Sequence, residues 1–74
     1  MNFERITINP DIFTGKACIR GLRFPVSRLL GLLAEGETKE AILEKYPYLE
    51  PEDIEAALRY ATFLAEEETL EWAG

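Results

Sequence analysis

Histidine is absent from this 74-residue chain, and cysteine occurs once, at Cys18. Without histidine the chain lacks the commonest metal ligand and the usual general base at neutral pH, which excludes zinc fingers, Cys/His nucleophile pairs and Ser-His-Asp triads. A single cysteine forms no intramolecular disulfide, and we interpret it as a buried structural residue because it lies between Ala17 and Ile19. We therefore expect no enzyme activity, no cofactor, no metal and no small-molecule substrate.

Long apolar runs are also missing. None approaches the roughly 18 residues of a membrane span, and the N-terminus lacks the apolar stretch of a secretory signal. We therefore expect a cytoplasmic protein without membrane contact. The length allows one small domain, whose core rarely supplies more than roughly 3–5 kcal/mol of net stability. Since disulfides and metals are excluded as reinforcement, self-association is expected, and we predict a homodimer.

Basic residues are few, because eight Lys and Arg stand against fourteen Asp and Glu, for a net charge of −6. The first 34 residues carry five basic and two acidic groups, whereas the remainder carries three basic and twelve acidic groups. An acidic chain disfavours non-specific nucleic-acid binding, whose affinity grows with each phosphate that is neutralised. Any DNA contact is therefore expected from the basic residues of the N-terminal part, which are Lys16, Arg20, Arg23 and Arg28.

The first 25 residues predict a short β arm. Ile6 and Ile8 alternate with polar residues, as in a half-buried strand, and Asn9-Pro10-Asp11 has the composition of a turn. Residues 12–25 are expected to be irregular, with short extended pieces that pair with the first strand. Two arrangements stay open: an intrachain hairpin alone, or a hairpin that also pairs with a second copy and buries Ile6 and Ile8 between the copies.

Apolar residues at helical spacing then predict two short helices. The first is expected to open with Ser27 as its cap and to close at Gly36, which suits the left-handed position after a helix. Thr38 is expected to cap the second helix. Pro47 should end it, because a proline disfavours helical geometry in the residue before it.

The third predicted helix is the longest. It is expected to begin with Pro51 and to run to about Glu68. Its predicted inward face comprises Ile54, Ala57, Leu58, Ala61 and Ala65. Together these patterns predict one mainly α domain, with a β arm at 1–25, a three-helix region at 26–68 and a tail at 69–74.

The short connection between the second and third helices resembles that of a helix-turn-helix. A DNA-reading helix presents its first turns to the bases, but here the positions expected to be exposed are Glu52, Asp53 and Glu55. The first basic residue is Arg59, and carboxylates at the helix start repel phosphate. A structural tri-helical core is therefore favoured over DNA reading by this helix, and both remain open.

The chain ends on an acidic and then an apolar segment. Consecutive helical residues point in different directions, so the run Glu66-Glu67-Glu68 is interpreted as a solvated face and not as a cation site. Leu70 and Trp72 follow it. They either fold back onto the core or anchor a partner protein, since tryptophan in a pocket carries much of an interface's energy.

Residues 15–26, GKACIRGLRFPV, resemble the hallmark GKPCIRGTRIPV of a prokaryotic family catalogued as domain-of-unknown-function family 433. The segment RITINP resembles its N-terminal strand, and EGETKEAILEKYPYLEPEDIEAALRYA resembles its second and third helices. Three residues depart from the hallmark, namely Ala17, Leu22 and Phe24. The loss of the usual threonine at Leu22 removes any polar contact carried there.

The resemblance implies a homeodomain-like, helix-turn-helix-like bundle of three helices behind a β arm. It also implies the antitoxin half of a toxin–antitoxin pair, whose toxin resembles a PIN-like nuclease. Our leading hypothesis is a dimeric antitoxin that neutralises this nuclease by direct binding, with its own operator DNA as a further expected partner. The alternatives are a stand-alone helix-turn-helix DNA-binding regulator and a small oligomeric adaptor.

Overall fold

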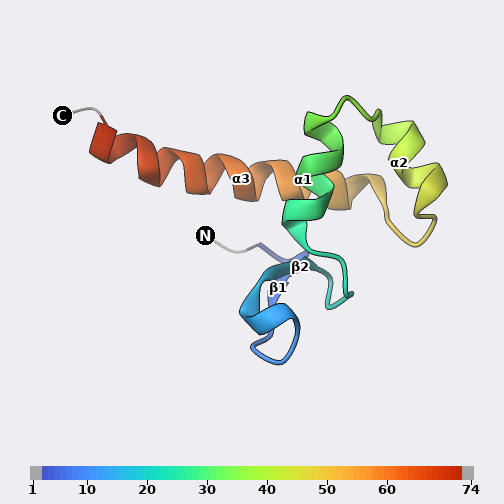
Figure 1. Cartoon of the computed structure of the whole chain (residues 1–74), viewed down its shortest axis with the longest axis horizontal. Coiled ribbons are helices and arrows are strands. Elements are labelled where there is room, and N and C mark those ends of the chain that lie inside the picture. Colours follow the sequence, from blue (N-terminus) through green and yellow to red (C-terminus); the bar gives the residue numbers. More distant parts are fainter. Residues whose placement is uncertain (1–2, 73–74) are drawn as a thin grey trace.

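The computed structural model describes residues 3–72, and side chains through Glu66. The elements, in chain order, are β1 (Ile6–Ile8), the 3-10 turn η1 (Phe13–Gly15), β2 (Ala17–Ile19), α1 (Val26–Ala34), α2 (Lys39–Lys45) and α3 (Pro51–Trp72). Within this range the fold is mainly helical, with three α-helices and a two-stranded antiparallel hairpin, as expected. Figure 1 shows α1 and α2 beside the first half of α3, with the hairpin below. No helix among the described residues is long and apolar enough to cross a membrane.

The predicted intrachain hairpin is confirmed. Its register pairs Ile6 with Ile19, Thr7 with Cys18 and Ile8 with Ala17. The turn predicted after β1 is present, because the Asn9 carbonyl accepts from the N–H of Ile12 at 2.9 Å and its Oδ1 accepts from the N–H of Asp11 at 2.9 Å. Such a side-chain bond to the backbone two residues on is the reason that asparagine favours turns.

A tight turn reverses the chain after β2. The N–H of Leu22 donates to the Ile19 carbonyl at 2.7 Å, and both central residues have positive φ, 44° at Arg20 and 71° at Gly21. Two positive φ values in succession are typical of a type I′ turn, whose twist suits hairpins. Glycine adopts them freely, whereas arginine does so at a cost of about 1–2 kcal/mol. Such a residue persists only where its surroundings hold it.

Helix α1 begins at Val26, two residues before the start that a Ser27 cap would give. Pro25 is its cap residue and no side chain caps it, so the prediction that Ser27 caps this helix is wrong. The fixed φ of Pro25 and its extended conformation set the entry into the helix. At the other end Gly36 has φ 95°, and its N–H donates to the Leu33 carbonyl at 3.0 Å. This left-handed ending confirms the prediction for Gly36.

Local capping explains the bounds of α2 and the start of α3. The Thr38 hydroxyl accepts from the N–H of Ala41 at 3.1 Å, which confirms Thr38 as the cap of α2. The helix ends at Lys45, two residues before Pro47. Helix α3 begins at Pro51 as predicted, because proline in the first turn gives up no intrahelical hydrogen bond.

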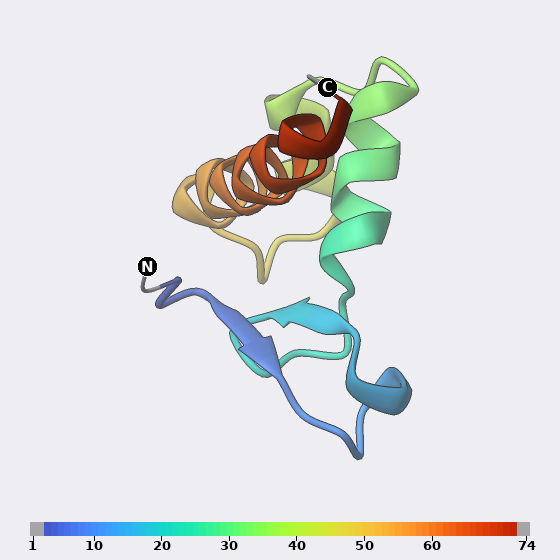
Figure 2. The ribbon, with the colours of Figure 1, turned by 90° about the vertical axis from the view of Figure 1, so that its left-hand side faces the viewer.

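Helix α3 is longer than expected. Its 22 residues run to Trp72 instead of ending near Glu68, a length of about 33 Å at 1.5 Å per residue. Figure 1 shows its C-terminal half extending past α1 and the hairpin, and Figure 2 views this half with its C-terminal end toward the reader. Because the helix continues in this direction, segment 69–72 does not return to the core, which was one of the two accounts of the tail.

The core lies where β2 and the three helices meet. Its buried hydrophobic members are Ile19, Phe24, Val26, Leu29, Ile42, Leu49, Ile54 and Ala57. Ile54 and Ala57 confirm the predicted inward face of α3. Leu58 and Ala65 contradict it, since both are exposed. Periodicity gives a helix an apolar stripe but does not say how much of that stripe its neighbours cover.

Candidate functional site

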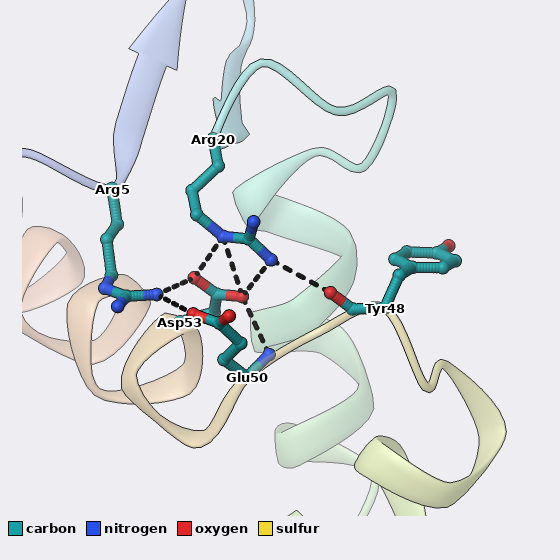
Figure 3. Close-up of polar contacts among 5 residues, drawn as sticks. All are labelled: Arg5, Arg20, Tyr48, Glu50 and Asp53. Atoms are coloured by element: carbon teal, nitrogen blue, oxygen red, sulfur yellow. Dashed lines mark hydrogen bonds and ion pairs between the residues drawn. The ribbon is translucent and has the colours of Figure 1, made fainter.

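A buried carboxylate, Asp53, joins the N-terminal arm to the start of α3 (Figure 3). Its Oδ1 accepts from Nη1 of Arg5 at 2.9 Å and from Nε of Arg20 at 2.9 Å. Its Oδ2 accepts from Nη2 of Arg20 at 2.9 Å and from the N–H of Glu50 at 2.8 Å. The Asp53 side chain is fully buried. The expectation of an exposed Asp53 at the start of the third helix is therefore wrong.

The position of Asp53 in α3 explains why a carboxylate is stable there. It is the third residue of the helix, and its bond to the N–H of Glu50, the residue before the helix, is the return contact of a capping box. The partial positive charge of the helix N-terminus also favours a carboxylate in the first turn. The two arginines then neutralise the buried charge, as burial of a carboxylate requires.

Each arginine also contacts the loop before α3. Nη1 of Arg5 donates to Oε1 of Glu50 at 2.6 Å, and Nη2 of Arg20 donates to the Tyr48 carbonyl at 2.9 Å. The Arg5–Asp53–Arg20 cluster, together with Glu50 and Tyr48, therefore ties both ends of the hairpin to one loop. It also supplies the contacts that hold Arg20 in its positive-φ conformation.

The electrostatics of the cluster favour its charged form. Burial by itself raises the pKa of Asp53, but hydrogen bonds from Arg20, from the Glu50 N–H and from Arg5 outweigh it, so the pKa lies below its ordinary value. The hydrogen bond to Glu50, followed by the one to Asp53, raises the pKa of Arg5, and the bond to Asp53 raises the pKa of Arg20. All three groups stay ionised at neutral pH, so the cluster holds the fold and offers no proton for catalysis.

Arg20, one of the four predicted DNA contacts, is part of this cluster. Its guanidinium makes two-pronged contact with Asp53, so its charge is already balanced. The other three residues, Lys16, Arg23 and Arg28, are exposed. Within residues 3–66 none of these three is part of an ion pair. Of the four predicted DNA contacts, Arg20 therefore has a structural role, and the other three have no carboxylate partner within residues 3–66.

Arg28 contacts two aromatic rings. Its guanidinium carbon lies 5.6 Å from the Phe24 ring centroid and 5.5 Å from that of Tyr46, within the range of cation–π contacts. Its Nη2 also donates to the Tyr46 hydroxyl at 2.9 Å. Phe24, which departs from the family hallmark, is buried in the core, and its ring contacts the guanidinium of Arg28.

The two isoleucines proposed for a strand-to-strand interface have different surroundings. Ile6 is half-buried and packs against the core of its own chain. Ile8 is exposed on the outside of the hairpin. Only Ile8 therefore offers an apolar surface to a second copy at this edge.

Helix α3 carries two separate apolar surfaces. The first, here called the outer face, consists of Leu58, Arg59, Thr62, Phe63 and Glu66. These residues line an open surface depression of about 320 Å³. The second, here the inner groove, lies between α1, β2 and α3, with a volume of about 240 Å³, and is lined by Lys16, Ala17, Val26, Ser27, Leu30, Tyr60 and Leu64. One exposed leucine marks each surface, Leu58 at 41 % exposure and Leu64 at 43 %.

The remaining predicted site residues are simply placed. Cys18 is buried, and its Sγ lies 3.5 Å from the Lys16 carbonyl, as expected of a structural cysteine. Glu66 is exposed, and among the described residues no three His, Cys, Asp or Glu side chains gather as a metal site would require. The side chains of Leu70 and Trp72, proposed as partner anchors, lie outside the described residues.

These features define a small helical protein whose hairpin arm is tied to its longest helix by buried ion pairs. The chain belongs to the family described as "Protein of unknown function (DUF433)", which matches residues 6–61. This confirms the resemblance seen in the hallmark. The family description assigns no activity.

Two relatives support this membership. The uncharacterized protein y4eO of Sinorhizobium fredii is 40% identical over 58 residues, which cover 78% of this chain and 26% of that protein. The chain thus spans about a quarter of the length of this curated relative. The crystal structure of a DUF433 member protein from Anabaena variabilis is 34% identical, with a TM-score of 0.78 over 95% of this chain and 69% of that one.

The structure also explains several residues of the hallmark. Arg20 and Gly21 form the turn that brings a guanidinium to Asp53, and Pro25 sets the entry into α1. Leu22, which replaces the usual threonine, packs against the core. Sequence reasoning missed Arg5 and the burial of Asp53. The available signal was the spacing between Glu50 and Asp53, which is that of a capping box.

Proposed function

We propose that the chain is a protein-binding module of the antitoxin type, which neutralises a partner nuclease by occupying its surface. The outer face of α3 carries this proposal. It combines an apolar centre, Leu58 and Phe63, with a charged rim, Arg59 and Glu66. An apolar centre inside a charged rim is the arrangement of protein interfaces. In this proposal the chain acts by binding, in the cytoplasm, without chemistry of its own.

The contacts of the outer face support a macromolecular partner. The Phe3 ring packs against Phe63, with ring centroids 5.5 Å apart, and this contact reduces the side-chain freedom that Phe63 would lose on binding. The Thr62 hydroxyl donates to the Leu58 carbonyl at 2.9 Å and needs no acceptor from the partner. A partner that buries Leu58 therefore leaves no polar group of this pair unsatisfied.

Charge indicates the kind of partner. After Arg59, α3 carries Glu66, Glu67, Glu68 and Glu71 and no basic residue. A surface that binds nucleic-acid phosphates is basic and is complementary to such a segment. The PIN-like nuclease implied by the family resemblance would present such a surface. The homodimer belongs to the same proposal.

Operator DNA is a second candidate partner, on one specific observation. Lys16, Arg23 and Arg28 are exposed, without a carboxylate partner among residues 3–66, and Arg28 is held by aromatic rings. This candidate requires an approach unlike that of a homeodomain, in which α1 and the turn before it, rather than the third helix, meet the phosphates. Charge reversal at Arg23 and Arg28 should then abolish binding to a labelled upstream DNA fragment, and unchanged binding removes the candidate.

Growth of a bacterial host tests the leading proposal. The product of the neighbouring reading frame is expressed alone, with the wild-type chain, or with Leu58→Glu. We expect arrest by the neighbour alone, rescue by the wild type and no rescue by the variant, since a buried carboxylate at an interface centre is costly. Ile8→Glu is the matched control and should rescue, because Ile8 is an exposed apolar residue of the hairpin and is not among the residues of the outer face. A harmless neighbour, or full rescue by Leu58→Glu, contradicts the proposal.

A further inference from the structure

The C-terminal half of α3 is covered less than its first half, and the ring of Phe3 against Phe63 is the contact with the N-terminal arm that the described residues show there. Ile54 and Ala57 are fully buried, Tyr60 and Ala61 are half-buried, and Leu64 is already 43 % exposed. Figure 1 shows the helix continuing beyond α1 and the hairpin without another element alongside. A helical segment of two or three turns is marginal in water unless one face packs against something. We therefore expect another surface to pack against this half of α3.

The inner groove provides an apolar surface beside Tyr60 and Leu64, where the C-terminal half of α3 begins. Its lining is apolar along Ala17, Val26, Leu30, Tyr60 and Leu64, and its polar residues are Lys16 and Ser27. Lys16 is exposed and forms no ion pair within residues 3–66. The groove therefore combines an apolar floor with an unpaired positive charge.

We infer that a second copy of this chain fills the inner groove, with the two α3 helices antiparallel across a two-fold axis near Leu64. A two-fold contact uses the same patch on both copies, and Leu64 lies at the end of the groove. Each copy then covers the C-terminal half of the other's α3. The outer face is not part of this contact.

Charge complementarity selects a second copy as the occupant. With Leu64 opposite Leu64, antiparallel numbering places residue 68 of one copy opposite Tyr60 of the other. Position 68, which lies in an acidic stretch of the sequence, is then at the rim of the groove that Lys16 and Tyr60 line. The same pairing occurs twice by symmetry. The basic first half and acidic second half of the chain thus meet their opposites in the partner copy.

This arrangement differs from a dimer formed through β1. In a dimer formed through β1, Ile8 would supply the apolar contact, since Ile6 packs against the core of its own chain. The inner groove instead adds Leu64, Leu30 and Tyr60 from each copy. The inference specifies the interface of the homodimer in the proposed function, and it does not depend on the partner at the outer face, because it uses the opposite side of α3.

Sedimentation equilibrium of the purified full chain tests the inference. We expect twice the 8.4 kDa chain mass for the wild type at roughly 100 μM, where even a micromolar dimer is almost fully formed. Leu64→Glu should raise the dissociation constant at least about 30-fold, as for a central interface residue. Leu58→Glu is the matched control, with a leucine of equal exposure on the outer face, and should remain dimeric. Far-UV circular dichroism checks that both variants fold.

A charge exchange gives a second, independent readout. Lys16→Glu should weaken the dimer severalfold, and adding Glu68→Lys to it should restore the dimer. A monomeric wild type overturns the inference. A Leu64→Glu variant as dimeric as the wild type overturns it as well, as does a charge exchange without rescue, since the contact then lies elsewhere on the chain.

Discussion

Replacement of Asp53 by asparagine removes the charge at the centre of the Arg5–Asp53–Arg20 cluster while keeping the shape of the side chain. Asp53 is fully buried and accepts from two guanidinium groups and one backbone N–H. Loss of one partner from a buried ion pair costs about 3–5 kcal/mol. Arg5 and Arg20 are 33% and 32% exposed, so water solvates part of their charge. We therefore expect the lower end, about 3 kcal/mol.

That cost is comparable with the whole stability of a domain of this size, roughly 3–5 kcal/mol. Urea unfolding followed by far-UV circular dichroism measures it, as the difference in free energy of unfolding between Asp53→Asn and the wild type. Glu50→Gln is the control, because Glu50 is exposed and its ion pair with Arg5 should contribute less than about 1 kcal/mol. Equal, small effects of the two variants would refute the assignment of Asp53 as the buried anchor.

Three further predictions concern acid stability and helix ends. Because the pKa of Asp53 lies below the unfolded value of about 3.9, its stabilisation is complete above that value and is lost as the pH falls through the lower folded pKa. Acid titration of unfolding should show this loss in the wild type and not in Asp53→Asn. Thr38→Ala should cost about 1 kcal/mol in urea unfolding, through loss of the cap of α2; no change would mean that water replaces the hydroxyl. Gly36→Ala should destabilise by about 1 kcal/mol, since φ is 95° there. Gly31→Ala, inside α1 and with open space around the added methyl group, should instead stabilise, and equal effects would contradict the conformational argument.

Local signals were sufficient for much of the fold. Thr38 and Gly36 mark helix ends through hydrogen bonds to residues three positions away, and Pro51 does so through its missing N–H, so the sequence alone predicts them. The alternation of Ile6 and Ile8 with polar residues is also a local signal, and it predicts the strand β1. The family hallmark added the identity of the fold, because its residues build β2, the turn at Arg20 and the start of α1.

Long-range contacts were not predictable in this way. Asp53 lies 33 residues after Arg20 and 48 after Arg5, and nothing in its neighbourhood in the sequence indicates that two arginines will bury it. Leu58 lies four residues after Ile54, as on one face of a helix, yet it is exposed because no element of the described chain covers that side of α3. Apart from the start of α1 and the end of α3, the positions that sequence reasoning misplaced are thus those whose surroundings depend on tertiary packing.

The central claim is that the chain works by presenting the outer face of α3 to another protein. Native mass spectrometry of the chain co-purified with the product of the neighbouring reading frame tests it most directly. The account predicts one complex of defined stoichiometry for the wild type, and only the free chain for Leu58→Glu at the same expression level. A complex of identical composition and abundance with Leu58→Glu, or the absence of any complex with the wild type, would contradict it.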